Sequence, residues 1–177
     1  MRKDIGVFGL YPTRTELERA VEALRGAGFR ATDVSILVPQ DRSTHELGHE
    51  MHSKAPEGGV TGAVAGGAVG GVLGWLASVG LLTIPGLGPF LAAGPIVAAL
   101  AGIGAGGATG GLIGALVGAG VPEVEAKRYE GRLRKGNVLC SVHCDDTKWA
   151  DRAKEILKST GAQEISSTAE ATADYRP

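Results

Sequence analysis

Residues Glu18–Phe29 read ERAVEALRGAGF, and residues Asp151–Ala162, near the other end of the chain, read DRAKEILKSTGA. Arg, Ala, Glu, Leu and Gly recur at the same places, and both stretches space their apolar residues as one face of a helix. The two stretches decide the fold, because they predict two similar halves of one domain. Chance similarity between two short amphipathic helices is the alternative.

The first half is assigned to residues 1–40. Ile5–Tyr11 (IGVFGLY) and Val34–Val38 (VSILV) are short apolar runs that predict strands on either side of the first helix. Thr13 and Glu16 have the spacing of a capping box, which predicts where that helix begins. The order is therefore strand, helix, strand.

The second half is assigned to residues 137–170 and repeats that order. Val138–Cys144 (VLCSVHC) and Gln163–Ser167 (QEISS) predict strands, and Asp145 and Asp146 are the capping residues of the helix between them. Two such halves predict an α+β fold, namely a split ferredoxin-like domain with a four-stranded antiparallel sheet and two helices on one face.

A glycine-rich block, residues 58–121, is inserted between the halves. Between Glu57 and Glu123 lie 65 residues without Asp, Glu, Lys, Arg or His, and 21 of the 29 glycines fall there. Glycines recur at every fourth position in two runs: Gly58, Gly62, Gly66, Gly70 and Gly74, then Gly102, Gly106, Gly110, Gly114 and Gly118. This spacing predicts two helices whose small-residue ridges pack closely against other helices, as in a glycine zipper.

The two helices are expected at Gly58–Gly80 and Pro95–Gly120, each long enough to cross a bilayer. The connection between them, Leu81–Gly94, is itself apolar, so the block is expected either inside the membrane or buried within a protein assembly. A flexible Gly/Ala linker is less favoured, because such linkers are polar and have no fixed period.

The charged flanks complete the domain scheme. Residues 41–57 are expected as a polar juxtamembrane connector, 122–136 as a charged helix and 171–177 as a flexible tail. Lysine and arginine residues cluster after the second glycine run, which predicts that both termini are cytoplasmic. The net charge of −1 gives no reason to expect nucleic-acid binding.

One motif suggests an enzyme. His45–His49 reads HELGH, which fits the H-E-x-x-H pattern of zinc peptidases with Glu46 as general base, and His52 follows. Gly48 interrupts the motif, and no further ligand stands at a usual spacing. His45, His49 and His52 are therefore only weak candidate metal ligands, and we expect no catalytic residue and no cofactor.

Longer motifs resemble a bacterial family of general-stress or low-temperature-induced proteins. They are KAPEG from residue 54, IPGLGPFLAAGPIVAALAG from residue 84, PEVEAKRYEGRLRKGN from residue 122 and LCSVHCDD from residue 139. The two ends are similar to the heat-induced stress protein domain. The resemblance implies a membrane-associated glycine-zipper stress protein and supplies no catalytic residues.

The resulting expectation is a structural homo-oligomer that contacts membrane lipid and acts as a scaffold under stress. It would lie in the bacterial inner membrane. A soluble cage or filament in the cytoplasm, with the hairpins buried between subunits, is the main alternative, and a zinc-binding protein is a minor one.

Overall fold

The computed structural model describes residues 5–40, 75–76, 80–84, 87–97 and 111–169. Within these ranges the chain has a mixed α+β fold built on one antiparallel sheet of six strands, in the order β3-β4-β2-β5-β1-β6. In chain order the elements are β1 (Ile5–Tyr11), α1 (Arg14–Gly26), the short 3-10 helix η1 (Ala31–Asp33), β2 (Val34–Pro39), β3 (Gly80–Ile84), β4 (Gly88–Ala93), α5 (Gly111–Gly118), α6 (Glu123–Arg134), β5 (Val138–Cys144), α7 (Thr147–Ser159) and β6 (Gln163–Ala169).

The two similar helices begin in the same way. The side-chain oxygen of Thr13 accepts a hydrogen bond of 3.3 Å from the N–H of Glu16, and that of Asp146 accepts one of 2.9 Å from the N–H of Trp149. Each bond satisfies one of the backbone donors that a helix leaves unpaired at its start. The predicted starts of α1 and α7 are therefore confirmed.

The two helices also end in the same way. Gly28 and Gly161 follow α1 and α7 with φ angles of +94° and +97°. The N–H of the residue after each glycine bonds back to the carbonyl of a leucine, Leu24 in one case and Leu157 in the other. Glycine suits this left-handed position because it carries no Cβ.

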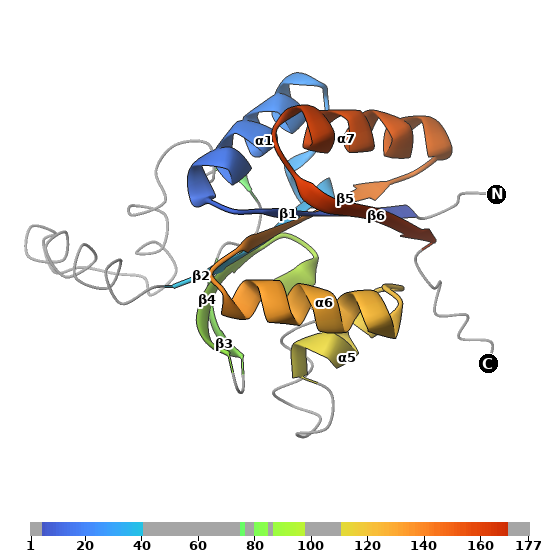
Figure 1. Cartoon of the computed structure of the whole chain (residues 1–177). Helices are drawn as coiled ribbons and strands as arrows, with labels where there is room; N and C mark the ends of the chain where they lie inside the picture. Colours follow the sequence, from blue (N-terminus) through green and yellow to red (C-terminus); the bar gives the residue numbers. More distant parts are fainter. Residues whose placement is uncertain (1–4, 41–74, 77–79, 85–86, 98–110, 170–177) are drawn as a thin grey trace, which may run out of the picture.

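The two ends of the chain interleave in the sheet. β5 lies between β1 and β2, with Gly9 opposite Cys140 on one side and Ile36 opposite Cys140 on the other. Helices α1 and α7 cover one face, and α5 and α6 cover the other (Figure 1). Because both faces are covered, β1 and β2 are almost continuously buried, which explains why their sequences are apolar without alternation.

The middle of the chain corrects the predicted two-helix hairpin. Leu81–Gly94, expected as a connection between helices, contains the strands β3 and β4, which form a hairpin that extends the sheet from β2. Phe90 and Ala92 of β4 are buried against the α6 side of the sheet. The apolar run is therefore buried within the sheet of this chain, rather than at the tip of a helical hairpin.

The structure describes only part of the two helices predicted in the glycine block. Gly58–Gly74 lies outside the described residues, and α5 is the described part of the second helix, with eight residues. Among the helices of the described ranges, none combines the length and the apolar character that crossing a membrane requires. The predicted charged helix is confirmed as α6, with acidic residues in its first turn and basic residues in its last.

Candidate functional site

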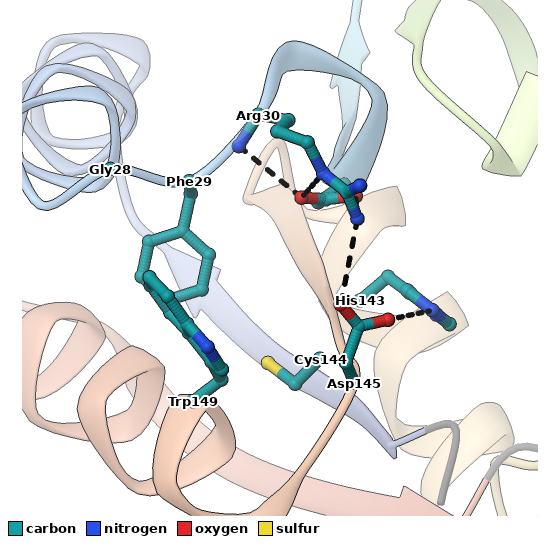
Figure 2. Close-up of a pocket in the computed structure, with 8 residues that line it drawn as sticks. Gly28, Phe29, Arg30, His143, Cys144, Asp145 and Trp149 are labelled. Carbon is teal, nitrogen blue, oxygen red and sulfur yellow. Dashed lines mark hydrogen bonds and ion pairs between the residues drawn. The ribbon is translucent and has the colours of Figure 1, made fainter. Parts of the chain in front are cut away.

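A pocket of about 210 Å³ opens where β5 ends and η1 begins (Figure 2). The chain supplies its lining from three places that are far apart in sequence, because the interleaved halves bring the end of α1, the end of β5 and the start of α7 together. The lining residues are Gly28, Phe29, Arg30, Asp33, His143, Cys144, Asp145 and Trp149.

Charged groups form the rim of this pocket. Arg30 donates to both carboxylate oxygens of Asp33, at 2.8 Å from Nε and 2.9 Å from Nη2. Asp145 lies farther away, with its oxygens 3.7 Å from Arg30 Nη2 and 4.0 Å from His143 Nε2 (Figure 2). The Arg30–Asp33 pair is a strong bidentate contact, whereas Asp145 makes only long ion pairs and keeps capacity to accept further hydrogen bonds.

Aromatic side chains form the wall beside α7. The rings of Phe29 and Trp149 meet edge to face, with centroids 4.9 Å apart and planes at 77°. Arg152 is exposed, and its guanidinium carbon lies 5.7 Å from the centre of the Trp149 ring. A cation over an indole is favourable, so this wall already carries one bound cationic group of the chain itself.

Of the two cysteines of β5, Cys144 lines this pocket and Cys140 lies deeper in the core. Both side chains are buried on the α1 side of the sheet, and they form no disulfide within the described part of the chain. Burial raises the pKa of the Cys140 thiol to about 12, so it stays protonated at neutral pH. Across the ranges that the structure describes, no three His, Cys, Asp or Glu side chains gather to hold a metal ion.

The residues singled out from the sequence lie elsewhere. His45, Glu46, His49 and His52 fall outside the described residues, so the weak zinc motif has no geometry here. Eight of the ten glycines predicted to pack helices also fall outside them. At Gly114 and Gly118, both in α5, an added Cβ would meet nothing within 4 Å, and their packing role stays a prediction.

Sequence reasoning missed this pocket, although it placed several of its residues in other roles. Asp145 and Asp146 were both predicted to cap the helix, but only Asp146 does so, and Asp145 points to the pocket rim. The signal was present in the tandem aspartates, of which a helix needs only one as its N-cap.

Comparison with known proteins gives the family. The family model described as "Alternative complex III, ActD subunit" matches residues 5–167. No curated protein and no solved structure matches the chain.

This match overturns the resemblance to general-stress proteins, and with it the interpretation of the chain as a membrane-associated glycine-zipper scaffold used under stress. The family match runs through both halves of the domain, from residue 5 to residue 167. Because it spans nearly the whole chain, the chain belongs to the family of the ActD subunit of Alternative complex III.

Proposed function

We propose that the chain is a non-catalytic docking subunit of a respiratory electron-transfer complex, and that it holds other subunits in place through the pocket rim at β5. The observation that carries the proposal is the family match over residues 5–167. A member of this family is a subunit of a multi-subunit complex, so its partners are other subunits.

The chemistry of the pocket supports docking rather than catalysis. Arg30 is paired with Asp33, and Cys144, although it lines the pocket, is buried. Asp145, whose side chain is 50% exposed, offers an acceptor at the rim beside His143. Such a rim suits a basic or hydrogen-bond-donating side chain of a neighbouring subunit.

We also propose that the scaffold is a split ferredoxin-like domain. The order β2-β5-β1-β6 with antiparallel pairing and with α1 and α7 on one face supports this assignment, since it is the arrangement that two strand–helix–strand halves give. The hairpin β3–β4 is then an addition to the edge at β2. The cytoplasmic placement of both termini remains a proposal from the charge pattern alone.

Affinity purification tests the docking role. With a tag on this chain, membranes and soluble extract are both purified under conditions that preserve complexes, and the co-purifying proteins are identified by mass spectrometry. We expect the other subunits of the complex. Recovery of the chain alone, or only in association with further copies of itself, would overturn the proposal.

Charge reversal at the rim then tests the surface. Asp145→Lys should lower the yield of co-purified subunits, while Asp151→Lys, on the outer side of α7 with its side chain 74% exposed, should not. Neither aspartate caps a helix, and the ion pairs that the variants lose are long and exposed, so both variants should stay folded with a loss of less than about 1 kcal/mol in a thermal melt. Equal yields from the two variants would exclude the β5 rim as a contact.

A further inference from the structure

The last strand of the chain forms an edge of the sheet. Among the described residues, β6 pairs with β1 alone, through Phe8 opposite Ser166, Val7 opposite Ser167 and Gly6 opposite Thr168. The backbone groups on its other side therefore lack a strand partner in the described part of the chain. An edge of this kind is a template for a further strand unless the chain protects it.

Only the beginning of β6 has a feature that hinders the pairing of a further strand with this edge. Glu164 has a φ angle of +51°, and the register with β1 shifts beside it, between Phe8 and Leu10. Such a bulge disturbs strand addition locally. From Ile165 to Ala169 the strand carries no proline and no charge, so this part stays open to pairing.

Helix α6 lies on the opposite face of the sheet from α1 and α7 and forms hydrogen bonds with β6 (Figure 1). The hydroxyl of Tyr129 donates to the carbonyl of Glu164 at 3.2 Å and lies 2.5 Å from Ser166 Oγ. Arg132 donates to Glu164 Oε1 from Nε at 3.0 Å and pairs with it from Nη2 at 2.7 Å. These bonds place Glu164 and Ser166, and by alternation Thr168, on the α6 face of the sheet.

Three oxygens beside this strand lack a donor. Glu125 Oε2, Glu164 Oε2 and Thr168 Oγ1 are buried and have no hydrogen-bond partner among the described residues. Burial raises the pKa of Tyr129, and the negative charges of Glu125 and Glu164 raise it further, so both carboxylates lie near this tyrosine. Arg132 contacts only Oε1 of Glu164, so the second oxygen of Glu164, together with Glu125 Oε2 and Thr168 Oγ1, leaves acceptors without donors at the seam between α6 and β6 in the described part of the chain.

We propose that β6 receives an extended segment of another subunit of the complex as a seventh strand, with a lysine or arginine side chain of that segment facing Glu164 and Thr168. Backbone pairing along Ile165–Ala169 would supply the affinity, and the unpaired acceptors would select a basic segment. The inference rests on the proposed function, because it requires a partner subunit.

Site-specific cross-linking tests the edge in the purified complex. Ser167 is exposed on β6, so Ser167→Cys labelled with a benzophenone maleimide places the probe at the edge, while Asp151→Cys on α7 carries the same probe as the control. The native thiols are buried and should stay unlabelled. We expect the β6 probe to cross-link a basic peptide of another subunit and the α7 probe to give no such product.

The outcomes separate the two proposals. If the labelled chain co-purifies with other subunits but cross-links only to itself, to a second copy or to an acidic or uncharged peptide, the strand proposal is wrong and the docking role stands. If no other subunit co-purifies at all, both are wrong. A product common to the β6 and α7 probes would also overturn the strand proposal.

A conservative variant tests, without a cross-linking probe, whether a lysine or arginine of the partner segment donates to Thr168. Thr168→Val removes a hydroxyl that has no hydrogen-bond partner in the described part of the chain, so the melting temperature should not fall. In cells that express variant and unmodified chains together, the variant should be depleted about tenfold in the purified complex, equal to about 1.4 kcal/mol. Ser167→Ala is the matched control and should be incorporated equally; equal incorporation of Thr168→Val would overturn the proposal.

Discussion

Gly94 shows how closely one residue ties the added hairpin to the rest of the sheet. It follows β4 with a φ angle of +81°, and an added Cβ would lie 2.1 Å from the carbonyl oxygen of Val34 and 2.8 Å from Ser35 Cα. Two residues later, the N–H of Ile96 donates to Ser35 Oγ at 3.2 Å. The chain can pass this close to β2 only because position 94 has no side chain.

Replacing this glycine should therefore be far more costly than its backbone angle alone implies. We expect Gly94→Ala to lower the free energy of unfolding by about 3 kcal/mol or more, since backbone must move to relieve the clash. Gly136→Ala is the matched control, because Gly136 has a φ of +90° but open space around it, and should cost about 1 kcal/mol. Urea unfolding measures both, and equal losses would contradict the account.

The buried thiol predicts a specific response to alkaline pH. The pKa of Cys140 is raised by burial to about 12, whereas an unfolded cysteine has a pKa of about 8.5. Its contribution to stability is therefore complete below about pH 8.5 and is lost as the pH rises through about 12.

We expect the free energy of unfolding to fall between pH 8.5 and 9.5, by up to about 1.4 kcal/mol per pH unit from this group. Cys140→Ala should be less stable overall, because it leaves a cavity, but should lack this part of the slope. Urea unfolding at pH 7.5, 8.5 and 9.5 gives the comparison. An unchanged slope in the variant would assign the effect to other groups.

At the scale of elements, α6 has one internal weakness that substitution should remove. Gly131 lies inside the helix, and an added Cβ would meet nothing within 4 Å. Gly131→Ala should raise the free energy of unfolding by about 1 kcal/mol, because alanine is the better helix former. Gly26→Ala, at the end of α1 and equally unobstructed, should gain less. Thermal and urea unfolding test this, and a loss at Gly131 would show that the site is constrained.

The elements that the sequence predicts well are those whose local signals agree with each other. Ile5–Tyr11 and Val138–Cys144 are short apolar runs ended by turn or capping residues, and both are strands. Thr13 and Asp146 mark the starts of the two similar helices, and both side chains act as caps. Here local preference and tertiary packing favour the same structure.

The hairpin β3–β4 was missed because a different pattern dominated the interpretation. The glycine period suggested two long helices, so the apolar segments LLTI and PFLAA were assigned to the connection between them. Their short length, with proline and glycine between them, is the usual signal of a strand hairpin. The pocket was missed for another reason: Arg30, Asp33 and Asp145 come together only once β2 and β5 pair, which no local pattern encodes.

At the scale of the whole molecule, neither half can fold without the other. β5 supplies the pairing partner of both β1 and β2, so a chain that ends at Lys135 should show no cooperative unfolding and no dispersed amide spectrum. Without β5 and β6, β1 loses both of its neighbours and β2 keeps only the hairpin β3–β4, so the sheet is divided at its centre. Adding a separate peptide of residues 136–177 should restore both signals. A folded fragment 1–135 would contradict the interleaved sheet.

The position of β5 also bears on when the protein can fold as it is made. Tyr11 pairs with Val138, and its hydroxyl donates a hydrogen bond of 3.3 Å to the carbonyl of Leu157. The first strand therefore cannot pair until residues more than a hundred positions later have been synthesised. At synthesis rates of about 5–20 residues per second, the 127 residues from Tyr11 to Val138 take roughly 6–25 s to appear. During that interval the apolar strands β1 and β2 have no central partner on the ribosome. This sheet can therefore form only after β5 has been synthesised, and the nascent chain depends on protection from aggregation until then.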